Sequence, residues 1–190
     1  MAFWTEGQLQ DPKRQYRFVA QFTGLGAGGC SWFVKNVDKP NVSISEASHE
    51  YLNHTFYYPG RVSWNTISVT FVDPVDPDAS ATMMKAIEVA GYKIPTDATS
   101  LGTLSKSKSI ESLGTVTIKQ VDSEGIAVEE WKLNNAWIKS VNLSGLDYSG
   151  DSLSEATIEI RYDWASLISH GASGNTATGA SLTKDQGIWK

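Results

Sequence analysis

This sequence of 190 residues offers little for covalent or metal chemistry, because it contains one cysteine, Cys30, and three histidines. A lone cysteine cannot form a disulfide within one chain, and this usage is typical of a reducing compartment. It also cannot build a zinc site by itself. We therefore expect neither a metal ion nor a cofactor.

Long apolar runs are also missing. No stretch approaches the ~18 apolar residues that span a bilayer. The polar, acid-containing segment Met1–Arg14 does not resemble a signal peptide. These two absences predict a protein that is made in a cytoplasm and does not enter a membrane.

Positive charge is in deficit, since 16 lysines and arginines face 21 aspartates and glutamates, for a net charge of -5. Gripping DNA through its phosphates requires clustered basic residues, so this balance argues against tight DNA binding. Hydrophobic residues make up 41% of the chain and charged residues 19%, which suits one folded domain. Seven tryptophans are many for this length and indicate an extensive contact surface.

Two glycine-containing motifs resemble catalytic or nucleotide-binding signatures, but their context favours turns. Gly150–Leu153 has the GDSL sequence of a serine esterase family, which carries it near the N-terminus. Here it lies late, and the only later histidine is His170, in a Gly/Ser-rich tail. A nucleophile needs a base within hydrogen-bond reach. Gly24–Gly29 resembles a dinucleotide loop, but an expected strand follows it instead of the required helix. We therefore expect no catalytic residues and no enzyme.

Aspartates and histidines that could bind a metal do not have the required spacing. Counted from Asp73, a calcium loop would need glycine at its sixth position and glutamate at its twelfth, where this chain has Asp78 and Met84. His49 and His54 lie five residues apart with no cysteine or third histidine nearby. We expect a turn and helix cap in the first case and a structural or interface role in the second.

Strand-type patterns dominate the chain, and we expect a mainly β fold. Alternating, β-branched and aromatic residues separated by turn signals mark the expected strands. We expect four hairpins, which join 16–23 to 31–37, 41–51 to 61–72, 115–121 to 126–133, and 136–146 to 152–162.

One short helix is expected at about residues 77–90. Asp76 suits its N-cap, Pro77 suits its first position, and Gly91 suits its end. Apolar residues recur between them at helical spacing. Residues 92–114 contain no convincing element, and a loop this long is typically functional or interfacial.

The pair 41–51 and 61–72 changes the parity of its apolar positions midway along each segment. Val42 and Ile44 share one face, for example, whereas Ala47 begins the opposite parity. A β-bulge produces such a change. We therefore expect a bent hairpin, typical of sheets that curl into barrels, with Leu52–Gly60 as its tip.

Several stretches together resemble the tail tube proteins of contractile-tailed (myovirus) bacteriophages. The resemblance covers roughly residues 14–166, and it rests on the order of the stretches because no single motif is diagnostic. These stretches are 16–22, 39–42, 59–65, 69–74, 131–138, 146–148 and 161–164.

This family is similar in fold to the needle protein of type VI secretion systems. The resemblance implies two packed antiparallel sheets that curl into a barrel, with one helix at an edge. It implies a single tube-like domain at 1–166, with an N-terminal arm at 1–15 and a Gly/Ser/Thr-rich extension at 167–190. The implied assembly is a stack of six-membered rings in the virion tail, built in the host cytoplasm. Its implied partners are tail sheath, baseplate and terminator proteins, and DNA passes through without specific binding.

Two surfaces would then carry the function. Aromatic residues in a turn without an evident core are typical of subunit contacts, although they could instead pack on their own subunit. The expected interface residues are Asn53, His54, Phe56, Tyr57, Tyr58, Phe3 and Trp4. Polar residues opposite the apolar face of the bent hairpin are expected to face the lumen, where an acidic or neutral wall would repel phosphates, or else to form an ordinary solvated face. These are Glu46, Ser48, Glu50, Ser68 and Thr70.

Other readings of the sequence remain open. A tube initiator, a tube terminator or a type VI secretion needle protein would have the same fold. A carbohydrate-binding β-sandwich is permitted by the tryptophan content, but it would need a flat exposed row of aromatic side chains.

Overall fold

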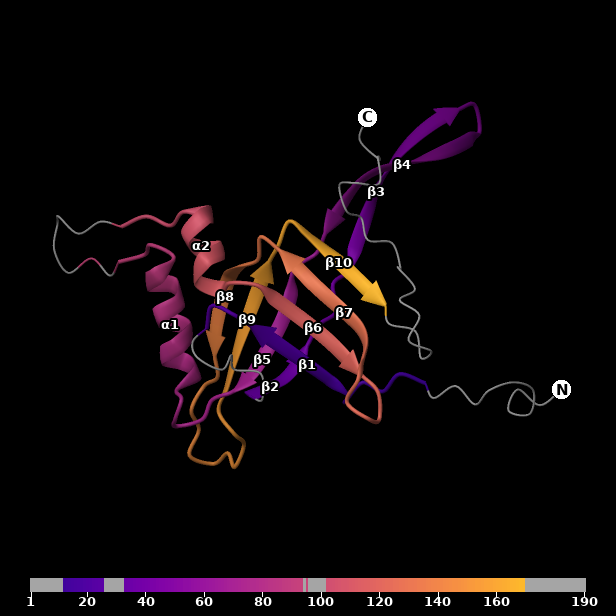
Figure 1. Cartoon of the computed structure of the whole chain (residues 1–190). Coiled ribbons are helices and arrows are strands. Elements are labelled where there is room, and N and C mark those ends of the chain that lie inside the picture. Colours follow the sequence, from indigo (N-terminus) through magenta and orange to yellow (C-terminus); the bar gives the residue numbers. More distant parts are fainter. Residues whose placement is uncertain (1–11, 26–32, 94, 96–101, 170–190) are drawn as a thin grey trace, which may run out of the picture.

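The computed structural model describes residues 12–25, 33–93, 95 and 102–169. Two four-stranded antiparallel sheets form the body, and a two-stranded ladder projects from it (Figure 1). The first sheet has the order β1 (Phe18–Phe22), β6 (Val116–Val121), β7 (Ala127–Asn134), β10 (Trp164–Ser169). The second has the order β2 (Val34–Val37), β5 (Ile67–Val72), β9 (Glu155–Arg161), β8 (Trp137–Leu143). The projecting ladder pairs β3 (Val42–Tyr51) with β4 (His54–Trp64).

The core lies between the two sheets, because each sheet buries alternate side chains on one face. In β5 and β6 every second residue is buried. The rings of Phe22, from the first sheet, and Phe71, from the second, lie 5.5 Å apart. The fully buried side chains include Phe22, Ile67, Val69, Phe71, Val116, Ile158, Ile160 and Tyr162. The prediction of a mainly β fold with two packed antiparallel sheets is confirmed. The two sheets remain separate ladders in the described residues.

Two of the four expected hairpins are confirmed, and the other two differ from the structure. β6 pairs with β7, and β8 pairs with β9, in the expected antiparallel sense. The first two strands do not pair with each other, because β1 pairs with β6 and β2 pairs with β5. Local patterns identify these strands but not their partners, since the choice of partner depends on contacts with strands distant in sequence. The strand β10 continues to Ser169, past the domain end expected at residue 166.

The fourth expected pairing, of 41–51 with 61–72, is right only at its base, where residues 42–44 pair with 62–64. β3 pairs instead with β4, and β5 belongs to the second sheet. The tip is therefore the two-residue turn Leu52–Asn53, and the segment expected as a tip is mostly strand. Pro59 is tolerated because a two-stranded ladder leaves one backbone edge of each strand free. The expected bulge is present, since the register shifts between Ile44 and Glu46.

The structure contains two helices in the described residues, where one was expected. The expected helix is α1 (Ala79–Val89), and Gly91 follows it with a φ of 113°. Its N-cap is Asp78, whose Oδ1 accepts from the Ala81 N–H at 2.8 Å, and not Asp76. The second helix, α2 (Lys106–Leu113), lies in the segment expected as a loop. It was missed because only Ser112 and Leu113 are buried, which gives no apolar periodicity. Both helices lie beside β8 (Figure 1).

Candidate subunit interface

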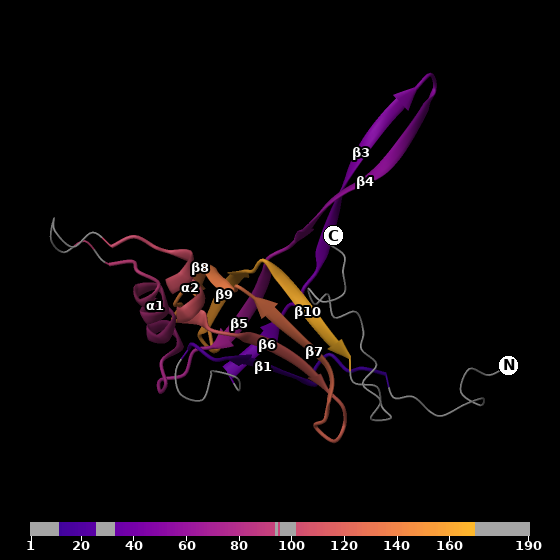
Figure 2. The same ribbon diagram turned by 45° about the horizontal axis from the view of Figure 1, so that its top comes forward.

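The ladder of β3 and β4, residues 42–64 and here called the arm, extends the β2–β5 ladder beyond the body. Two backbone hydrogen bonds bridge the two chain segments between the body and the arm. They run from Asp38 N–H to Ser68 O and from Asn65 N–H to Asn41 O, and both are 3.0 Å long. Every residue of β3 is exposed. Both ribbon views show the arm projecting away from the two sheets (Figure 2).

The distal half of the arm has two chemically different faces, which its register defines. Side chains alternate between the two sides of a strand. Residues two positions apart therefore share a face, and so do residues that lie directly opposite each other in the ladder. The aromatic face contains Ala47, His49, Tyr51, His54, Phe56 and Tyr58, and the acidic face contains Glu46, Ser48, Glu50, Thr55 and Tyr57. On the aromatic face the rings of His54 and Phe56 contact edge to face, with centroids 4.7 Å apart.

The register therefore divides the expected aromatic anchors. Phe56 and Tyr58 share a face, whereas Tyr57 lies on the other one. Tyr51, which was not among the expected anchors, is 64% exposed and lies opposite His54 on the aromatic face. Asn53 lies in the exposed turn. Phe3 and Trp4 lie outside the described residues.

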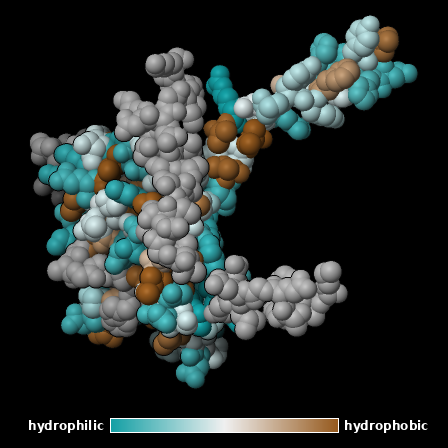
Figure 3. All heavy atoms as spheres, turned by 45° about the vertical axis from the view of Figure 1, so that its right-hand side comes forward, coloured by the Kyte–Doolittle hydropathy of each residue, from teal (hydrophilic) through white to brown (hydrophobic). Residues whose placement is uncertain are grey.

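A second apolar surface lies where the arm leaves the body. Val42, Ile44 and Val62 are each at least 47% exposed, and Ile44 is paired with Val62. Figure 3 shows apolar side chains gathered at this place. A ribbon of two strands is at best marginally stable in water, and contiguous exposed apolar groups are typical of interaction sites. The arm thus has the properties of an element that is completed by another chain.

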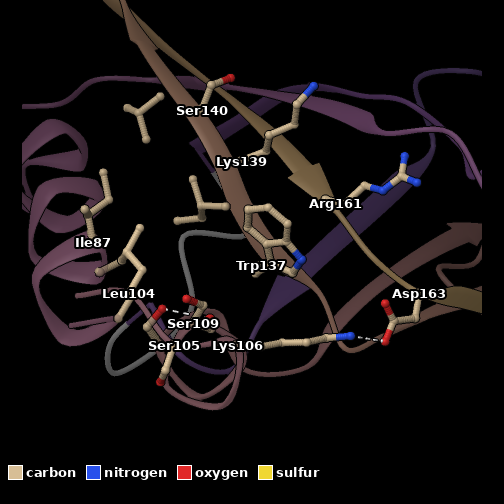
Figure 4. A pocket seen from close by; sticks show the side chains of 15 residues that line it. Ile87, Leu104, Ser105, Lys106, Ser109, Trp137, Lys139, Ser140, Arg161 and Asp163 are labelled. Atoms are coloured by element: carbon tan, nitrogen blue, oxygen red, sulfur yellow. Dashed lines mark hydrogen bonds and ion pairs between the residues drawn. The ribbon is translucent and has the colours of Figure 1, made fainter. Parts of the chain in front are cut away.

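A groove of about 590 Å³ lies at the other edge of the second sheet, between the helices and β8. Its apolar lining includes Ile87, Leu104, Trp137, Ile138 and Val141. Figure 4 shows Ile87 and Leu104 on the helix side, Lys139 and Arg161 on the strand side, and Trp137 between them.

Three basic groups line the groove, Lys106, Lys139 and Arg161, against one carboxylate, Asp163. Lys106 Nζ lies 2.7 Å from Asp163 Oδ2, and this hydrogen bond holds the pKa of Asp163 below its ordinary value. Lys139 Nζ lies 2.9 Å from Glu159 Oε1. The pKa of Glu159 is also lowered, first by the hydrogen bond from Thr66 and then by the one from Lys139. The basic edge of the groove is therefore partly neutralised.

A polar cluster fixes the base of the arm. Glu129, on the inner side of β7, accepts hydrogen bonds from Lys13, Lys39 and Trp131. Lys39 Nζ also donates to Gln120 Oε1 at 2.7 Å. Burial by itself raises the pKa of Glu129, but the hydrogen bonds outweigh it and lower the pKa to about 2. The carboxylate thus ties the residue next to the arm to the first sheet.

The residues expected to face a lumen are not brought together within one chain. Glu46, Ser48 and Glu50 lie on the exposed arm. Ser68 and Thr70 lie half-buried on the outer face of the second sheet, where Thr70 Oγ1 is 3.2 Å from Thr157 Oγ1. Whether either group faces a lumen stays a prediction.

The motifs considered for chemistry have structural surroundings. The GDSL sequence lies in an exposed connection whose turn is fixed by hydrogen bonds from the Ser149 N–H to Asp147 Oδ1 and from the Gly150 N–H to Asp147 O. Asp73 and Asp78 both bind backbone N–H groups at the start of α1. In the part of the chain that the structure describes, no cluster of three or more metal-binding side chains was found. Over the same residues, no helix has the length and apolarity to cross a membrane.

Comparison with solved structures identifies the fold. The cap of the anti-feeding prophage tube matches with a TM-score of 0.62 and 16% identity, over 89% of this chain and 99% of that one. The sheath-tube complex of an extracellular contractile injection system matches with a TM-score of 0.59 and 13% identity, over 85% and 94%. The sheath/tube terminator of an extracellular contractile injection system matches with a TM-score of 0.61 and 15% identity, over 84% of this chain and 99% of that one.

These likenesses extend over most of both chains, although the sequences have diverged. No family model matches this chain, and no curated protein matches it. The chain therefore has the fold of tube, cap and terminator proteins from contractile injection systems.

Proposed function

We propose that this chain is the tube subunit of a contractile tail. Six copies form a ring, rings stack within a sheath between a baseplate and a terminator, and the tube conducts phage DNA. The single observation that carries the proposal is the arm, an exposed two-stranded ribbon with an aromatic face and with no core of its own. The likeness to a sheath-tube complex supports the same function.

The physical reason for self-association is the cost of leaving the arm uncovered. Aromatic side chains provide large contact areas at low conformational cost, and Tyr is enriched at the energetic centres of interfaces. Open strand edges are also liabilities that closed assemblies remove. In a closed ring, each copy covers the aromatic side chains and the open strand edges of its neighbour. An isolated subunit leaves both exposed to water.

The net charge of -5 suits a conduit that must not retain DNA. Six copies per ring give an acidic assembly, which lowers the local attraction for phosphates. Ser68 and Thr70 keep their assignment to the lumen in this proposal, because they present hydroxyl groups on the outer face of the second sheet.

A tube terminator is the second candidate function, and one observation favours it. The likeness to the cap and the terminator is as strong as the likeness to the sheath-tube complex. The two functions differ in assembly, since a tube subunit stacks into long tubes whereas a terminator stops at one ring. A carbohydrate-binding module would need a flat exposed row of aromatic side chains. Trp164 is the only exposed tryptophan among the described residues, so the exposed aromatic residues of the arm are tyrosines and Phe56, and Tyr57 lies on a different face from Phe56 and Tyr58.

Negative-stain electron microscopy across a concentration series tests the proposal. We expect hollow tubes or stacked rings from the wild-type chain, and single rings would support the terminator instead. The variant Phe56→Ser with Tyr58→Ser removes the aromatic face and should remain folded but fail to assemble. Replacing the exposed Tyr148 and Tyr16 by Ser is the matched control and should assemble normally. Wild-type protein that stays monomeric at every concentration would contradict the proposal.

A further inference from the structure

The arm and the groove lie at opposite edges of the second sheet. The arm continues the ladder of β2 and β5, which form one edge, whereas the groove flanks β8, the strand at the other edge. Both ribbon views place the helices and the arm on opposite sides of the body. The arm therefore points away from the groove of its own chain.

We propose that the groove between α1, α2 and β8 receives the distal arm, residues 46–58, of a second copy. This inference rests on the proposed function and names the surface through which the copies join. Contact between two different surfaces is head-to-tail, and repeated contacts of this kind generate rings or open filaments. A self-complementary contact of arm with arm would instead stop at a dimer.

The chemistry of the two surfaces is complementary. The distal arm carries Glu46 and Glu50 and contains no lysine or arginine. The groove carries three basic groups, Lys106, Lys139 and Arg161, against Asp163 in its lining and Glu159 beside Lys139, which leaves a net positive charge of one. Opposite charges on two surfaces speed their encounter and fix the register of docking.

The shape of the groove suits a ribbon that enters edge-on. Ile87 and Leu104 lie on the helix side, and Lys139 and Arg161 lie on the strand side (Figure 4). Lys106 adds a paired basic group to the helix side, and Trp137 adds an apolar ring to the strand side. The arm likewise has one aromatic and one acidic face. An edge-on ribbon would place the aromatic face against the helices and the acidic face against the basic strand side. The groove volume lies within the ~300–1,000 Å³ range of sites that enclose small ligands, so it can hold the few ring side chains of the tip.

A complementation experiment tests this pairing. The groove variant carries Leu104→Glu and Arg161→Glu, two changes at exposed lining residues. The arm variant carries Phe56→Ser and Tyr58→Ser. Each variant alone should be monomeric by light scattering. An equimolar mixture should form a dimer that grows no further, because it contains one intact arm and one intact groove.

A control variant separates the groove from general effects of charge. Leu146→Glu with Lys85→Glu makes the same change in charge and apolarity at exposed positions outside the groove lining. This control should assemble like the wild type. The groove variant should associate at least tenfold more weakly.

Photo-crosslinking locates the contact directly. A benzophenone amino acid in place of Tyr57, on the acidic face, should cross-link to peptides that contain residues 137–141 or 161–163 of a second copy. Cross-links to other segments, or normal assembly of the groove variant, would overturn the inference and leave the proposed function intact. A wild-type chain that neither assembles nor cross-links would contradict the proposed function itself.

Discussion

The ammonium nitrogen of Lys39 lies 3.0 Å from Oε1 of Glu129, and this contact joins the segment before the arm to the buried face of β7. The side chain of Glu129 is 9% exposed, whereas those of Lys39 and Lys13 are about half exposed. The carboxylate is therefore the member of the cluster that depends on its partners. Without them, burial would favour its neutral form.

Replacing Glu129 by Gln should destabilise the folded chain by about 1–3 kcal/mol. The shift of the Glu129 pKa from 4.5 to about 2 corresponds to an upper limit of roughly 3.4 kcal/mol. The loss should be smaller than this limit because the two half-exposed lysines can regain water. Urea unfolding at pH 7 measures this loss, on the Phe56→Ser, Tyr58→Ser background so that assembly does not contribute. The control Glu124→Gln, at an exposed turn position, should change the unfolding free energy by less than ~0.5 kcal/mol.

The contribution of Glu129 should also disappear in acid. Its folded-state pKa is depressed, so the unfolded chain binds the proton more tightly and the stabilisation exists above pH 4.5. It should be lost as the pH falls from 4.5 towards 2. Unfolding free energies at a series of pH values should show the difference between the wild type and Glu129→Gln narrowing over this window. If the difference in unfolding free energy between the wild type and Glu129→Gln stayed constant down to pH 2.5, the hydrogen bonds to Glu129 would not depend on its ionised carboxylate.

Two aspartates, but not the one expected from the sequence, should stabilise the start of α1. Asp73 Oδ1 accepts from the N–H groups of Ala79 and Ser80, at 3.0 and 3.2 Å, and Asp78 provides the N-cap. Asp73→Ala should cost about 1–2 kcal/mol, the usual size of a lost helix cap. Asp76→Ala changes an exposed residue and should cost less than ~0.5 kcal/mol. Thermal unfolding of both variants measures which one loses more stability. Equal losses of stability would contradict the prediction.

Local patterns were sufficient for the strands of the body and for the hairpins of β6 with β7 and β8 with β9, but not for the partners of β1 and β2. The alternation in β5, β6 and β9 marks one buried face for each strand. Nothing in β1 or β2 specifies that they enter different sheets, because that choice depends on contacts distant in sequence. The tip was expected to extend to Gly60, yet Pro59 is accepted within a ribbon whose outer edges are free.

The candidate interface was predictable in part, for similar reasons. Exposed aromatic residues at 56–58 could be identified from the sequence, but their division between two faces follows from the pairing with β3. The groove could not be predicted, since its lining comes from four distant segments, 86–90, 104–112, 137–141 and 161–163. A signal for α2 did exist, in the N-cap Ser105 and in Gly114, whose φ is 69°. Without apolar periodicity it was not sufficient.

The arm docking and the lumen assignment predict different results for Glu46 and Glu50. If the acidic face of the arm docks against the basic side of the groove, Glu46→Lys with Glu50→Lys should slow association about tenfold at low salt. The effect should shrink at high salt because exposed charges are screened. Light scattering after rapid dilution measures the rate. Unchanged assembly combined with slower release of DNA would instead place these residues at the lumen.

Gly60 should control the path of the arm without affecting the body. A β-carbon at this position would lie 2.4 Å from Ser45 Oγ and 2.9 Å from Ser45 O. Ser45 Oγ in turn accepts from the Arg61 N–H at 2.8 Å, so the bulge is closed around the glycine. Gly60→Ala must therefore distort the register shift. Because β3 and the bulge are exposed, the melting temperature should change by less than about 2 °C while assembly falls strongly.

Truncating Ser45 to Ala in the same chain removes the closer clash but leaves the carbonyl contact, so it should restore assembly only in part. Full assembly of Gly60→Ala alone would show that docking does not depend on the shape of the bulge.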